Sequence, residues 1–317
     1  MALYSIEQKW LGLGKETTRG TAVAPTRFIP VEAGSEAEYK LNLIEDETVR
    51  GIFEKFPPKA GTKEGTFSIS GIEGDVNNIG ELIYSLLGDV TTTQLDTDAY
   101  QHVFKRSNSI TLPSYTITIH RGINAKRYPL SVVKSLVFTQ GVDAKLKIDA
   151  SGIFKTEEDY SSPPTPTWSE LKTMMFYNNI FKIDGTQNTM VREWSVTIDN
   201  GSVGIRALNN TQDIVDVISH AKLVTTGSFV IFFENETQRQ KFLNNTSADV
   251  EILVEGEQLT TGHNYTLKIK LPQIHYTAYP FGEVEGLLGA SVSFNVYYNL
   301  TAQNSVEITL KNNINGY

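Results

Sequence analysis

The sequence has no cysteine, few histidines and no long apolar run. Without cysteine, its 317 residues exclude a disulfide scaffold, thiolate catalysis and cysteine-ligated zinc or iron–sulfur sites. No apolar stretch reaches the roughly 18 residues that a membrane-spanning helix needs. The first residues also lack the basic stretch and apolar block of a signal peptide. We therefore expect a soluble protein of about two domains with no membrane partner.

Basic residues are also fewer than acidic ones. The chain has 28 Lys and Arg against 36 Asp and Glu, a net charge of −8. Residues 1–160 carry 18 basic and 21 acidic side chains (−3), and residues 161–317 carry 10 and 15 (−5). A surface that grips duplex DNA usually needs clustered Lys and Arg, so this balance argues against such a surface.

No motif assigns catalytic, cofactor-binding or metal-binding residues. The segment Gly12–Thr17 lacks the glycine spacing of a phosphate-binding loop. His263 and His275 form a metal pair only if a hairpin brings them together. The acidic triples 45–47 and 157–159 lack the ligand spacing of an EF-hand loop, and solvated acidic loops are the simpler interpretation. We predict no enzyme activity and no cofactor.

Alternating apolar and polar residues dominate what is present. This period of two predicts strands with one buried face. It occurs in 66–70, 115–119, 146–150, 194–198, 265–269, 292–297 and 306–310. Helical periodicity is rarer: it predicts one helix from Asn77 to Leu87 and a weaker one from Glu236 to Leu243. A third segment, 168–177, is ambiguous between helix and strand. The pattern predicts a mainly-β protein.

Three prolines mark a break at 161–167, which we interpret as a stiff linker. The halves on either side resemble each other in the order strand, helix, strand, strand. The matched pairs are 64–69 with 226–231, 114–119 with 264–269, and 145–154 with 291–300. We predict an N-terminal arm (1–35), a β module (36–160), the linker (161–167) and a second β module (168–317). The modules would be sandwiches or partial barrels, each with one short helix; two unrelated β domains are the alternative.

Aromatic pairs leave a second function class open. Tyr276 with Tyr279, or Tyr297 with Tyr298, could form a sugar-binding platform, although core or interface packing is the default for such pairs. The alternatives to a structural protein are therefore a carbohydrate-binding or host-attachment module and a β-sandwich hydrolase. The hydrolase would need a paired-carboxylate cleft, which no pattern marks.

Several segments together resemble a known family. They are Gly14–Pro25, Phe28–Val31, Glu47–Gly51, the Gly-x-Phe strand with its helix, Tyr100–Phe104, and the strand that runs into Leu271-Pro272. In these segments the chain is similar to the tail tube (major tail) proteins of long, non-contractile-tailed bacteriophages, the siphophages. The resemblance implies a tail-tube-like fold and a virion protein without catalytic residues.

The resemblance also implies partners. Such proteins stack as rings into a hollow conduit for DNA, and a duplicated module implies three chains per ring with pseudo-six-fold symmetry. It further implies contacts with the tape measure and tail-end or baseplate proteins, and assembly in the host cytoplasm. Another tail ring protein is the near alternative. We predict that residues 40–65 and the arm 1–35 reach the next ring and order on assembly, and that part of the acidic excess faces the lumen.

Overall fold

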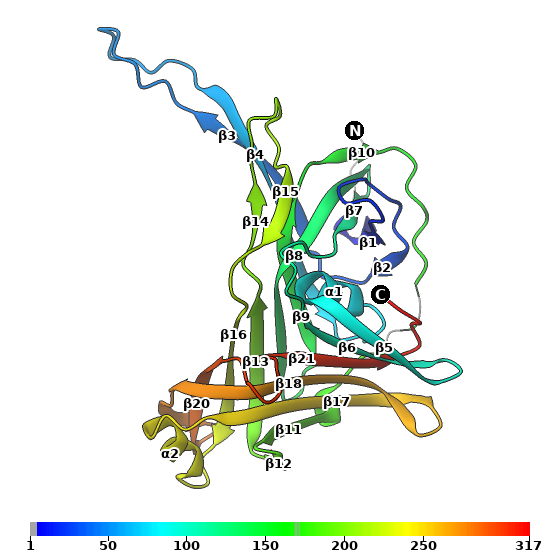
Figure 1. The fold of residues 1–317 in the computed structure, drawn as a ribbon, viewed down its shortest axis with the longest axis vertical. Helices are drawn as coiled ribbons and strands as arrows, with labels where there is room; N and C mark the ends of the chain where they lie inside the picture. Colours follow the sequence, from blue (N-terminus) through cyan, green and yellow to red (C-terminus); the bar gives the residue numbers. More distant parts are fainter. Residues whose placement is uncertain (1–4, 169, 171) are drawn as a thin grey trace.

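Strands make up most of the computed structural model, which describes residues 5–168, 170 and 172–317 (Figure 1). The first half contains β1 (Lys9–Lys15), β2 (Arg27–Ile29), β3 (Glu36–Ile44), β4 (Lys59–Glu73), α1 (Gly80–Leu87), β5 (Gly88–Asp96), β6 (Ala99–Arg106), β7 (Tyr115–Arg121), β8 (Ala125–Gly141), β9 (Lys147–Phe154) and β10 (Glu158–Tyr160). The second contains β11 (Asn179–Ile183), β12 (Thr186–Gln187), β13 (Val191–Asp199), β14 (Ser202–Ile205), β15 (Asp216–Ser219), β16 (Val224–Phe232), α2 (Thr237–Leu243), β17 (Ala248–Thr260), β18 (His263–Ala278), β19 (Phe281–Val284), β20 (Leu287–Val296) and β21 (Glu307–Asn312). The predicted mainly-β fold, with one short helix in each half, is confirmed.

Two layers of strands cross each other. The long sheet has the order β3-β4-β9-β8-β13-β16-β20-β19. The second layer has the order β5-β6-β21-β18-β17-β11. In Figure 1, β8, β9, β13 and β16 run nearly vertically, and β5, β6, β17, β18 and β21 cross them. One continuous core of buried apolar side chains includes residues of both layers, among them Phe138, Phe229, Leu267 and Ile308.

The two halves share backbone hydrogen bonds across both layers. In the long sheet β8 pairs with β13, which places Leu136 opposite Ile198. In the second layer β6 pairs with β21, which places Phe104 opposite Ile308. The segment 161–167 contains neither helix nor strand. The division of the chain into two domains at this segment stays a prediction. The two halves are connected by strand pairing as well as by the segment itself.

A repeated Gly–Phe contact supports the two similar modules. Gly65 on β4 lies opposite Phe154 on β9, and Gly227 on β16 lies opposite Phe294 on β20. A Cβ added at Gly65 would lie 2.5 Å from the Phe154 ring, and one at Gly227 would lie 2.2 Å from the Phe294 ring. In both modules an aromatic ring therefore covers a glycine on the neighbouring strand. The two glycines stand at matched positions of 64–69 and 226–231, but the match of 145–154 with 291–300 pairs Phe154 with Leu300 and not with Phe294, so the register of that match was wrong.

A second matched pair is not equivalent in space. The segment 114–119 forms β7, the third strand after α1, whereas 264–269 lies in β18, the second strand after α2. The hairpin β5–β6 occupies the place after α1 that β17–β18 occupies after α2. The match was wrong because short alternating strings resemble each other whenever one strand face is buried.

The helices begin later than predicted. The carboxylate of Asp75 accepts hydrogen bonds from the Asn77 N–H (2.9 Å) and from Asn78 Nδ2 (3.0 Å), and these bonds hold this segment in a turn before α1. Gly88 ends α1 with a positive φ of 82°, as expected for a C-cap. The ambiguous segment 168–177 contributes only isolated bridges at residues 173 and 175 and the start of a 3₁₀ turn at 176–178; residues 169 and 171 lie outside the described residues.

Much of the predicted arm is part of the fold. β1 pairs with both β2 and β7, and Leu11 on β1 is fully buried opposite Ile119. The prediction that residues 1–35 become ordered only on assembly is therefore wrong for 9–15 and 27–29. The apolar face of β1 is buried within a single chain, which the local sequence did not reveal.

Candidate assembly surfaces

One face of the long sheet is polar along its width. Alternate side chains point into the core and are buried, as Phe67, Phe138, Trp194, Phe229 and Val292 are. The residues between them are exposed or half-buried and mostly small and hydroxylated: Thr66, Ser68, Ser151, Ser135, Thr139, Ser195, Thr197, Thr226, Ser228, Ser291 and Ser293. We call this surface the polar face.

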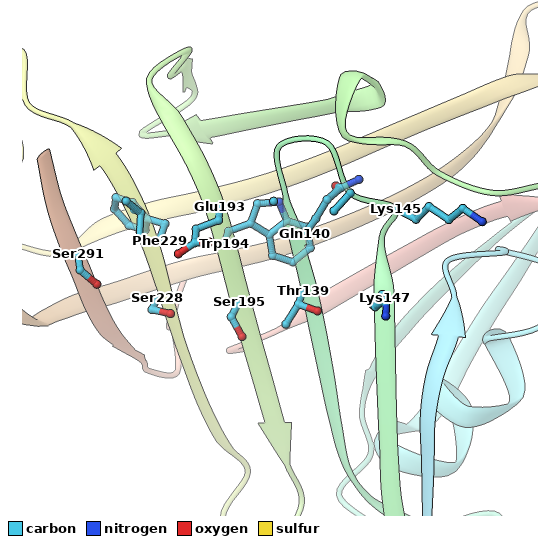
Figure 2. Close-up of a pocket in the computed structure, with 13 residues that line it drawn as sticks. Thr139, Gln140, Lys145, Lys147, Glu193, Trp194, Ser195, Ser228, Phe229 and Ser291 are labelled. Atoms are coloured by element: carbon cyan, nitrogen blue, oxygen red, sulfur yellow. The ribbon is translucent and has the colours of Figure 1, made fainter. Parts of the chain in front are cut away.

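Hydroxyl side chains form rows across this face. Thr139 on β8 lies opposite Ser195 on β13, which lies opposite Ser228 on β16. Figure 2 shows these three residues on neighbouring strands, beside Lys147 on β9. The shallow hollow that they line contains Lys145 and Lys147, and both are ion-paired, to Glu73 at 2.7 Å and to Glu32 at 2.5 Å. Both lysines of the hollow are therefore neutralised, whereas Glu193, which also lines it, forms no ion pair within the described residues, so the free charge of the hollow is negative.

Acidic residues outnumber lysines on the polar face. Four acids on it form no ion pair within the described part of the chain: Glu64, Asp149, Glu193 and Asp199. Its lysines Lys40, Lys145 and Lys147 are each paired with an acid, Lys40 with Glu38 at 3.0 Å. The unpaired charges on this face are therefore negative.

The long sheet ends in two unpaired edges. Among the described strands, β3 pairs only with β4 and β19 pairs only with β20. On β3, the Ala37 N–H donates to the neighbouring Glu36 carboxylate (3.0 Å), and the Ala37 carbonyl accepts from Arg121 (3.3 Å). Side chains thus occupy backbone groups that point away from β4, where a further strand would bind.

The Glu36 carboxylate at this edge is held in its charged form. Burial would raise its pKa, but hydrogen bonds from Arg121, from the Ala37 N–H and from Lys9 outweigh burial and lower the pKa. On the other edge, the Pro280 carbonyl accepts from the Ser291 N–H on β20 at 3.1 Å. Because backbone direction alternates along a strand, residues 281 and 283 direct their N–H and C=O groups outwards.

The hairpin β3–β4 projects from the body of the molecule (Figure 1). Its tip, residues 45–58, has no regular structure and exposes Val49 and Phe53 almost completely. Within the tip, Arg50 pairs with Asp46 at 2.6 Å and lies 4.2 Å from the Phe56 ring centroid. The predicted charged loop 40–65 is therefore a loop only at 45–58, because its flanks are strands.

A second extension contacts the base of this hairpin. The connection between β14 and β15 lies beside it, where the Lys63 N–H donates to the Gln212 carbonyl (2.9 Å) and Arg206 donates to the Lys63 carbonyl (2.6 Å). The Tyr39 hydroxyl donates to Asp213. Within this connection, the side chain of Leu208 is fully exposed. Two projecting segments thus present apolar tips to solvent.

The glycine-rich segment Gly12–Thr17 serves packing. A Cβ at Gly14 would lie 2.4 Å from the Ala24 carbonyl oxygen, so glycine permits close chain approach here. The Glu16 carboxylate accepts four hydrogen bonds, from Ser114 Oγ (2.6 Å), the Gly20 N–H (2.7 Å), the Leu130 N–H (2.8 Å) and Thr116 Oγ1 (2.9 Å). This carboxylate ties β1 to β7 and β8.

The structure also shows where the candidate histidine pair and the acidic segment 157–159 lie. His263 and His275 lie on the same strand, β18, separated by about 40 Å of extended chain, so the suggestion that a hairpin brings them together is wrong. The acidic residues of 157–159 pair with Lys126 and Arg127. Among the described residues, no group of three or more His, Asp or Glu side chains is arranged to hold a metal ion.

The aromatic pairs differ in exposure. Tyr276 and Tyr279 are buried, and the Tyr276 hydroxyl donates to Gln238 at 2.8 Å. Tyr297 and Tyr298 are about half exposed, and the Tyr297 ring meets His275 edge-on at a centroid distance of 5.4 Å. Of the suggested sugar platforms, only the second is open to solvent. No helix in the described part of the chain is long and apolar enough to cross a membrane.

Two β halves joined by sheet, with unpaired sheet edges and one polar face, are typical of structural proteins that build larger assemblies. The model of the phage tail tube protein family matches residues 9–296, nearly the whole chain. The chain therefore belongs to the phage tail tube family and is a component of the virion tail, as the resemblance implied. No curated protein matched the sequence.

Proposed function

We propose that this chain is the ring-forming subunit of the tail tube of a long, non-contractile-tailed phage. Copies close into rings through the edges of the long sheet, and the rings stack into a conduit that delivers DNA to the host. The observation that carries this proposal is the pairing of a polar face with two unpaired edges on one sheet. Edge pairing between copies would remove both free edges of the long sheet.

The polar face suits the lumen of such a conduit. Its small hydroxylated side chains leave the surface smooth, and the unpaired acids Glu64, Asp149, Glu193 and Asp199 repel phosphate. DNA would therefore pass without specific binding. A lumen built from Lys and Arg would contradict this part of the proposal.

The duplication favours three chains per ring, giving six modules with pseudo-six-fold symmetry. The exposed tips at 45–58 and around Leu208 are the surfaces that would reach the next ring. The tape measure and tail-end or baseplate proteins are the further partners that we propose, with assembly in the host cytoplasm.

Electron microscopy of the purified protein tests the proposal. Negative staining should show tubes or stacked rings with a central hole of a few nanometres, and the assembled protein should not retain duplex DNA at low salt. Chains that stay monomeric at high concentration would contradict it. If such monomers bound glycans, and binding were lost on substituting Tyr297 and Tyr298, the carbohydrate-binding alternative would replace it.

A further inference from the structure

The junction between the two modules inside the chain provides a template for the junction between chains. The repeated Gly–Phe contact aligns β4 with β16 and β9 with β20. On this alignment, Ala37 of β3 corresponds to Trp194 of β13, because each lies opposite the phenylalanine two residues after its glycine. The unpaired edge β3 therefore corresponds to β13, which is paired with β8.

The other edge aligns in the same way. Ala150 of β9 corresponds to Ala290 of β20, and these residues lie opposite Leu136 of β8 and Phe281 of β19. β19 therefore corresponds to β8. Inside the chain β8 and β13 pair directly, whereas their counterparts β19 and β3 lie at opposite ends of the long sheet.

We propose that β19 of one copy pairs with β3 of a second copy in the register of the internal β8–β13 junction. Thr139 lies opposite Ser195 at that junction, so Val284 should lie opposite Glu38. By the same correspondence Gly282 should lie opposite Lys40. The inference rests on the proposed function and specifies which residues meet when a ring closes.

The backbone directions at both edges agree with this register. The outward groups on β3 belong to residue 37 and, by alternation, to 39 and 41. Those on β19 belong to 281 and 283, since the Pro280 carbonyl is bonded to β20. The proposed register places residue 41 opposite 281 and 39 opposite 283, so outward groups meet outward groups. A shift by one residue would not allow this.

The side chains agree as well. Leu41 and Phe281 are 46% and 44% exposed in the single chain, and they would form a cross-strand apolar pair. Their counterparts at the internal junction, Ile198 and Leu136, form such a pair and are fully buried. Pairing of the two edges would therefore cover the exposed apolar side chain of each with that of the other.

Engineered cysteine pairs test the register directly, because the chain has no cysteine of its own. The pairs Glu38→Cys with Val284→Cys and Lys40→Cys with Gly282→Cys are in register. The same four positions recombined, 38 with 282 and 40 with 284, are shifted by two residues. A side chain at Gly282 meets no atom within 4 Å, so the substitution fits the single chain. Thr139→Cys with Ser195→Cys is the internal control.

In-register pairs at positions without backbone hydrogen bonds have Cα atoms about 4.5 Å apart, whereas diagonal neighbours are about 7–8 Å apart. Disulfides need Cβ atoms about 3.5–4.5 Å apart, so after mild oxidation of assembled tubes the in-register pairs should give at least about tenfold more intermolecular cross-links than the shifted pairs. On non-reducing gels the ladder should end at the trimer if three chains close a ring. The control pair should cross-link only within one chain.

Tube formation is scored separately by electron microscopy of each reduced variant. Tubes that cross-link in register support the inference. Tubes that cross-link only through the shifted pairs, or through none while the internal control oxidises, overturn the register and leave the tube function standing. Folded wild-type protein that forms no rings or tubes overturns both.

Discussion

Replacing Gly227 by alanine tests the Gly–Phe contact that defines each module. The added Cβ would lie 2.2 Å from Phe294 Cζ, and the ring is almost completely buried. Nonbonded carbon atoms rest about 3.5–4.0 Å apart, so the ring must retreat by more than about 1 Å within a packed core. Overpacking of this kind typically costs about 1–3 kcal/mol, and we expect about 2 kcal/mol for G227A.

The assay is thermal unfolding of the unassembled protein, followed by circular dichroism. Unfolding entropy is about 2.1 cal/mol/K per residue, so for a chain of this length the variant should melt about 3 °C below wild type. Gly256→Ala is the matched control, because its new Cβ meets its nearest atom at an ordinary 3.7 Å. In the double variant G227A/F294L the smaller side chain should recover part of the loss, giving a favourable coupling energy. A G227A variant that melts with wild type would refute the packing argument.

Three further predictions concern the core and the hairpin. Glu16→Ala leaves four hydrogen-bond donors without their acceptor and should lower the free energy of unfolding by at least about 2 kcal/mol in urea titrations, whereas the exposed Glu7→Ala should not change it. His102 is fully buried, with Nε2 donating to the Ile314 carbonyl (2.9 Å), and burial lowers its pKa below the ordinary 6.5. The unfolded chain therefore takes up the proton first, so stability should fall as the pH drops below about 6.5; an equal slope in His102→Gln would contradict this. Replacing residues 46–57 by a short turn should leave the melting temperature of the monomer unchanged but shorten or abolish tubes, and normal tubes would show that the tip does not link rings.

Short-range patterns in the sequence were enough to predict the kind of structure. Alternation in segments such as 66–70 and 292–297 predicted strands with one buried face, and the 3.6-residue spacing around Ile83 predicted α1. The family segments predicted a tail tube protein, which the family match confirms. These predictions held because periodicity and capping depend on neighbours in the chain, and a pleated strand shows its burial pattern locally.

Which strands lie next to one another became known from the three-dimensional structure alone. The pairing of β8 with β13 and the burial of Leu11 in the presumed arm both depend on contacts between distant segments. Local alternation is the same whichever partner a strand has. It therefore cannot show that β7 and β18 occupy different places in the two halves, and it cannot tell a paired strand edge from a free one. The two unpaired edges and the polar face between them became visible only when the register of every strand was known, because register fixes both the partner and the face.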